Sequence, residues 1–149
     1  MDPVVETVVG NLEQLRQDIH AGLAGQSAAA LNWRPYPGGN TIAGLLAHMI
    51  ESSTFLLATG RGETIERHRD EQFAATSPDA ATLLAQVDAA WTTLQARASA
   101  YTPADFAAQY SMRGTPRTGA WFLLHIGEHM LEHWGQIQLT RDLYAQQAG

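Results

Sequence analysis

Apolar residues recur every three to four positions in four separate stretches of this chain, which is the spacing of one face of an α-helix. The stretches cover about residues 2–23, 41–59, 79–100 and 120–146. Segments rich in glycine, proline and polar residues separate them, and such segments are typical of loops. The pattern therefore predicts four long helices and no extended sheet.

Residues that favour helix starts precede these stretches. Asp2-Pro3 combines a capping residue with a proline at the first helical position, and Ser77-Pro78 repeats that combination before the third stretch. Asn40 or Thr41 is placed to cap the second. These signals support the predicted boundaries independently of the apolar spacing.

The last predicted helix is apolar nearly all round and follows the loop-like segment 114–119. A helix of that kind is buried on several sides. We therefore expect an all-α fold, a single four-helix-bundle domain over residues 1–149, in which part of the last helix also packs against a second subunit. The expected assembly is a homodimer.

Size and charge narrow the class of protein. The chain has 149 residues, 45% of them hydrophobic, which suits one domain with a substantial core. Its formal charge is −6, and no basic cluster is longer than residues 67–69, so nucleic acid is not an expected partner. No apolar run approaches the roughly 18 residues that span a bilayer, and no signal peptide is evident, so we expect a cytoplasmic protein without a membrane partner.

The chain contains neither cysteine nor lysine. This excludes cysteine nucleophiles, thiolate zinc sites, disulfides and lysine Schiff bases. All nine basic residues other than histidine are arginines.

Three histidines, His125, His129 and His133, follow one another at four-residue spacing near the end of the chain. At this spacing they lie on nearly one face of a helix, a turn apart. The outer two are about 12 Å apart along the axis, whereas a metal–nitrogen bond is about 2.0–2.1 Å, so only one adjacent pair can share an ion. A three-ligand site needs a third donor from elsewhere.

Three other histidines compete for that place. His48 lies among apolar residues of the second predicted helix and is expected to point into the core. His68 lies in a strongly polar run and is expected on the surface, and His20 lies on the flank of an apolar stripe. The alternative is that these histidines form only a half-exposed stripe and a core histidine bonded to a backbone carbonyl.

Other chemistry is less well supported. A di-iron bundle needs Glu-x-x-His motifs, and none occurs, while attachment of a c-type haem needs cysteine. Glu128 and Glu132 are the carboxylates nearest the histidine pair, but neither follows a ligand in the His-Glu-x-x-His order, so a helix-surface role is favoured. Arg113 and Arg117 either belong to a solvated loop or clamp an anionic substrate.

The segments Trp33–His48 and His125–Ile137 together resemble the DinB/YfiT-like superfamily of metal-dependent proteins. This resemblance implies a four-helix bundle of the up-down-down-up type. It also implies that His48, His129 and His133 bind a divalent metal ion. It leaves His125 outside the ligand set, as a pocket-lining or a structural residue, and Gln136 is expected to bond a ligand imidazole.

The resemblance also implies a reaction class. Some relatives are thiol-dependent transferases or isomerases that use a low-molecular-weight thiol such as mycothiol or bacillithiol, which here has to come from outside the chain. Zinc is the expected metal, with nickel, manganese or iron as alternatives. We expect a small-molecule substrate. The alternatives are a metal-dependent hydrolase and a non-catalytic metal-binding or dimeric binding module.

Overall fold

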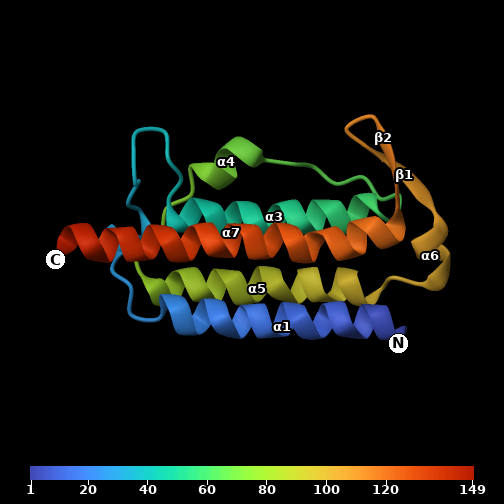
Figure 1. Ribbon diagram of the computed structural model, residues 1–149, viewed down its shortest axis with the longest axis horizontal. Helices are drawn as coiled ribbons and strands as arrows, with labels where there is room; N and C mark the ends of the chain where they lie inside the picture. The colour runs from blue at the N-terminus through green and yellow to red at the C-terminus, as the bar shows by residue number, and fades with distance from the viewer.

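Four long helices lie side by side in the computed structural model, which describes residues 1–149 (Figure 1). They are α1 (Pro3–Leu23), α3 (Ile42–Thr59), α5 (Ala80–Ser99) and α7 (Gly119–Ala148). Helices α1 and α7 run in one direction and α3 and α5 in the other (Figure 1). Helix α3 packs against both α7 and α5, and α1 packs against the same two helices. The expected up-down-down-up four-helix bundle is confirmed.

Side-chain caps define where the long helices begin. The side-chain oxygens of Asp2, Thr41, Asp79 and Thr118 each accept a hydrogen bond from a backbone amide in the first turn of the helix that follows. Thr41 rather than Asn40 caps α3, and Asp79 rather than Ser77 caps α5. The Ser77 hydroxyl instead donates to the backbone carbonyl of Asp79 at 3.0 Å.

The core lies along the centre of the bundle and draws on all four helices. Its largest fully buried side chains include Trp91 of α5 and Phe122 of α7. Helix α3 is apolar and long enough to cross a membrane by composition alone, but 72% of it is buried within the bundle. The expectation that no apolar run approaches membrane-spanning length is therefore corrected for α3, whose apolar character is explained by its place in the core of the bundle.

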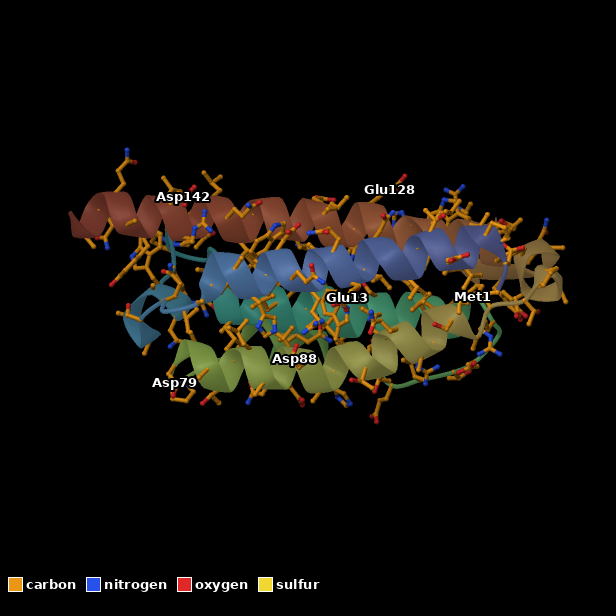
Figure 2. All side chains as sticks on the ribbon, turned by 90° about the horizontal axis from the view of Figure 1, so that it is seen from below. Met1, Glu13, Asp79, Asp88, Glu128 and Asp142 are labelled. Carbon is orange, nitrogen blue, oxygen red and sulfur yellow. The ribbon has the colours of Figure 1, made fainter.

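An ion-pair cluster joins α1 to α5. The Arg16 guanidinium bonds Glu13 on its own helix and Asp88 on α5, each at 2.8 Å, and His20 Nε2 lies 2.8 Å from the same Asp88 oxygen. Figure 2 shows Glu13 and Asp88 along these two helices. The hydrogen bond from Arg16 lowers the pKa of Glu13 to about 2. Because its ring contacts Asp88, His20 has a structural role between α1 and α5.

Five short elements lie in segments that the sequence pattern assigned to loops. They are α2 (Ala28–Leu31), α4 (Arg69–Phe73), α6 (Pro103–Ala107), β1 (Gln109–Met112) and β2 (Thr115–Thr118). The expectation that these segments are loops was therefore wrong for these residues. Local hydrogen bonds, such as the capping box at the start of α6, stabilise the short elements. Helix α4 packs on α3, and the two strands form a hairpin beside the start of α7 (Figure 1).

The hairpin turns through two residues, Arg113 and Gly114. Met112 pairs with Thr115, and both turn residues have positive φ, 51° for Arg113 and 80° for Gly114. Two-residue turns of this kind match the twist of the strands, and asparagine or glycine is the usual residue at the first position. Arg113 is the only non-glycine residue with positive φ.

One face of α7 is exposed in the single chain, and α7 is the helix that was predicted from the sequence to pack partly against a second subunit. Leu124, Leu131 and Leu139 are 54%, 62% and 60% exposed, and we refer to them as the leucine face. Leu143, nearer the end of the helix, is 39% exposed, whereas Phe122, Ile126, Met130 and Ile137 are buried in the core.

Candidate metal centre

His48, His129 and His133 lie together where α3 and α7 pack against each other. One ring nitrogen from each falls within 4.8 Å of those of the other two. The Nε2 atoms of His129 and His133 are 3.2 Å apart. Tetrahedral zinc with bonds of 2.0–2.1 Å requires ligand nitrogens roughly 3.3 Å apart. The three histidines therefore form a group that can hold a metal ion.

The second nitrogen of each ring faces a side-chain oxygen. His48 Nδ1 lies 3.0 Å from Gln72 Oε1, and His133 Nδ1 lies 2.8 Å from Gln136 Oε1. His129 Nδ1 lies 3.4 Å from the Ser53 hydroxyl. Such contacts fix the ring orientation and favour a proton on Nδ1, which leaves Nε2 free to bind a metal.

Burial favours the neutral form of the His48 and His129 imidazoles by lowering the pKa of each. It is the largest cause that lowers the pKa of His129 to about 3, and the neighbouring His133 and His48 act in the same direction. Burial also lowers the pKa of His48, against the hydrogen bond with Gln72. A metal binds only the unprotonated ring, so both residues are in the competent form at neutral pH.

His125, one turn before His129, does not join the group. Its ring stacks on Trp121, with centroids 4.2 Å apart, and its Nδ1 lies 3.1 Å from Glu128 Oε2. The group contains no fourth histidine and no carboxylate. Three protein ligands leave coordination positions open, which is typical of catalytic rather than structural zinc sites.

The three grouped histidines line a cleft of about 650 Å³. Its walls come from α3, the segment that includes α4, the hairpin and α7, and His125, Glu132 and Gln136 line it together with the three grouped histidines. This volume suits a small molecule. Two apolar hollows elsewhere, between α1 and α7 and between α3 and α5, contain no histidine.

Gln72 and Ser53, the partners of His48 and His129, were not predicted from the sequence. Gln72 is 97% buried, its relative exposure being 3%, although it lies in a segment expected to be a polar connection. Its Nε2 has no hydrogen-bond partner. Ser53 was detectable as a polar residue in an apolar helix, whereas nothing in the sequence near Gln72 indicates burial.

Comparison with known proteins supports the fold. The sequence profile of the DinB superfamily matches residues 11–137. A crystal structure of a DinB-like protein from Bacillus cereus has a TM-score of 0.73 at 16% identity, over 97% of this chain and 93% of that one. A conserved protein from Enterococcus faecalis has a TM-score of 0.76 at 14% identity, over 96% of this chain and 98% of that one. No curated protein matches the chain.

Proposed function

The chain belongs to the DinB superfamily, and we propose that His48, His129 and His133 bind one divalent metal ion in a catalytic centre. The observation that carries this proposal is the convergence of three histidine ring nitrogens, one from each side chain, beside an accessible cleft, with no fourth histidine and no carboxylate in the group. Zinc fits neutral imidazole ligands, as do nickel, manganese and iron. A bound ion would supply Lewis acidity, which lowers the pKa of a coordinated thiol or water.

We further propose that the reaction is a thiol-dependent transfer or isomerisation. The chain has no cysteine, so the thiol is a small co-substrate that enters the cleft. The cleft volume of about 650 Å³ is within the range of small-molecule sites, and we propose that it takes the thiol together with the second reactant. The residues around the grouped histidines would orient the two reactants, and the buried Gln72 and Ser53 would hold the rings in place.

A metal-dependent hydrolase is the second candidate, because Glu132 lines the same cleft and could accept a proton from water. Glu132 is exposed rather than buried, and Glu128 is paired with His125. Neither carboxylate is held against the three histidines, which favours the thiol reaction.

The test compares the two reactions in one preparation. Protein loaded separately with zinc, nickel, manganese or iron(II) is assayed for conjugation of bacillithiol, mycothiol or glutathione to 1-chloro-2,4-dinitrobenzene, and for hydrolysis of 4-nitrophenyl acetate. We expect conjugation that depends on the metal. Its rate should fall by more than about 100-fold in His133→Ala, which exceeds the loss caused by removing a residue that only hydrogen-bonds a metal ligand. His68→Ala, which changes an exposed histidine, should retain the activity. Hydrolysis alone would favour the second candidate, and neither activity would leave a binding module.

We also propose that two copies associate through the leucine face of α7. Gly127 and Gly135 lie on the same side of this helix, and no atom lies within 4 Å of where a Cβ would project from either. Exposed leucines beside glycine gaps on one helix form a self-complementary surface, as a two-fold interface requires. A second copy of α7 could approach closely there.

Light scattering after size-exclusion chromatography tests this assembly at micromolar concentration. The expected mass is twice the 16.2 kDa of one chain. Leu131→Glu should give the mass of one chain, because it buries a charge at the interface. Ala96→Glu, at an exposed residue of α5, which packs on α1 and α3, should leave the mass of the wild type unchanged. A monomeric wild type would contradict the proposal.

A further inference from the structure

The nine arginines of this chain divide into two groups according to their partners. Four of them form ion pairs with carboxylates, namely Arg16, Arg61, Arg97 and Arg141. Glu13, Asp88 and Asp142, which neutralise two of these, are labelled in Figure 2. Arg34 donates to the backbone carbonyl of Gly39. These contacts are sufficient to explain five arginines as structural residues.

The other four arginines have no carboxylate partner, and all of them line the cleft above the three histidines. They are Arg67, Arg69, Arg113 and Arg117, and we refer to them as the arginine group. Two come from the segment around the start of α4, and two come from the hairpin. The chain has fifteen carboxylates, yet Glu132 is the only one that lines this cleft.

Aromatic rings, rather than carboxylates, position three members of the arginine group. The guanidinium carbons of Arg67, Arg69 and Arg117 lie 4.6, 5.4 and 4.9 Å from the ring centroids of Phe55, Phe73 and Trp121. A guanidinium stacked on a ring presents its N–H groups at the edge of the plane. The stacked arrangement therefore leaves donors available for an anion.

Arg67 is the most constrained member of the arginine group. Its terminal nitrogen donates to the Ser52 hydroxyl at 3.1 Å, but its buried Nε has no acceptor. Burial lowers the pKa of Arg67, and the charges of Arg69 and Arg113 lower it further, against a smaller opposite effect of Glu51. An unpaired, half-buried cation among other cations is unfavourable unless an anion binds beside it.

Arg113 occupies a turn position that does not suit it. Its φ of 51° is in the left-handed region, where asparagine or glycine is favoured. Backbone strain of this kind is found mainly at functional sites. The turn places the Arg113 side chain at the cleft, together with that of Arg117.

We propose that the cleft binds a substrate that carries a carboxylate or phosphate group, with the arginine group holding this anion beside the three histidines. That the bound anion is a substrate rests on the proposed function, but anion binding itself does not require a metal. Arginine binds both kinds of group through paired N–H donors, so carboxylate and phosphate share one recognition chemistry. The arginine group contributes four positive charges to the cleft, and Glu132 contributes one negative charge. This excess of positive charge suits a ligand with at least two negative charges.

The test is calorimetric titration of inorganic phosphate and, separately, of succinate into metal-free and zinc-loaded protein at low ionic strength. We expect saturable binding of at least one of the two anions by the metal-free protein, weakened by added sodium chloride. The preferred anion then indicates the substrate group. Absence of binding by both forms would overturn the inference.

Arg113→Asn is the decisive variant because stability and binding should change in opposite directions. Asparagine suits the turn, so the melting temperature should be equal to or above that of the wild type, while the dissociation constant should rise about 10-fold or more. Arg117→Gln, at an exposed residue, should weaken binding in the same way. Arg141→Gln removes the same charge outside the cleft and should leave binding within about 2-fold of wild type.

Failure of this inference can be distinguished from failure of the proposed function. Anion binding that depends on the arginine group, in a protein that takes up no metal even when zinc is supplied, would support the inference and refute the metal centre. Metal binding together with anion affinity that is unchanged in Arg113→Asn and Arg117→Gln would overturn the inference and leave the metal centre intact. Anion binding by the zinc-loaded protein alone, unaffected by these substitutions, would also overturn it.

Discussion

Alanine in place of His48, His129 or His133 is expected to abolish near-stoichiometric metal binding, whereas His125→Ala should retain it. Each of the first three supplies one of only three protein nitrogens to the group, and His125 lies outside it. Removing an outer partner of a ligand already weakens metal binding by about 10–100-fold, so removing a ligand should exceed that range. Wild-type protein purified without a tag should contain about one ion per chain.

Metal binding should also raise thermal stability, because the ion binds the folded chain. At a free metal concentration about 1,000 times the dissociation constant, the gain is about 4 kcal/mol, or about 8–16 °C for a domain of this size. Metal content by mass spectrometry and melting with and without EDTA measure both effects. His68→Ala, at an exposed residue, is the matched control. Full metal content in His48→Ala would refute the three-ligand site.

Gly119→Ala is expected to destabilise the protein by more than about 3 kcal/mol, the largest effect that we expect from adding a single methyl group. A Cβ at this position would lie 2.0 Å from the backbone oxygen of Asp105 and 2.8 Å from that of Gly60. Both neighbours are backbone atoms, so no side chain can turn aside to make room. Gly119 also donates its N–H to Ala108 at 2.9 Å, which ties α6 to the start of α7.

Gly10→Ala provides the control for Gly119→Ala. Gly10 is exposed within α1, and no atom lies within 4 Å of where its Cβ would project. Alanine there should stabilise the helix by about 0.5–1 kcal/mol. Urea unfolding of both variants in EDTA measures the difference. A Gly119→Ala protein within 1 kcal/mol of the wild type would show that α7 can shift at its start without cost.

The four long helices were predictable because each repeats its apolar spacing over several turns. The predicted ranges differ from the observed ones by about two residues at most, and the capping side chains of Asp2 and Thr41 explain that accuracy. The short elements were missed because four or five residues carry too little periodicity. The hairpin was also obscured by Arg113, which is an unusual residue for its turn.

The histidine group could be predicted in part. The four-residue spacing showed that only one adjacent pair of histidines on α7 can share an ion, and the apolar residues around His48 indicated that it points into the core. Family resemblance selected His129 and His133 from the three candidates. Arg113 and Arg117 were recognised from the sequence as one possible clamp for an anion. Gln72, Arg67 and Arg69 could not be predicted to join the site, since they reach it only through the path of the chain between α3 and α5. The sequence shows only the short basic run at residues 67–69, and folding brings the two arginines of the hairpin to the same cleft.

The three histidines all project from the middle of long helices, whereas the arginine group comes from the connecting segments. Metal binding and substrate specificity are therefore determined by different parts of the chain. Insertions, deletions and exchanges in connections leave a bundle core undisturbed far more often than changes within its helices do. Exchange of connecting segments between related proteins, by evolution or by design, could therefore change the substrate specificity while the metal ligands are retained.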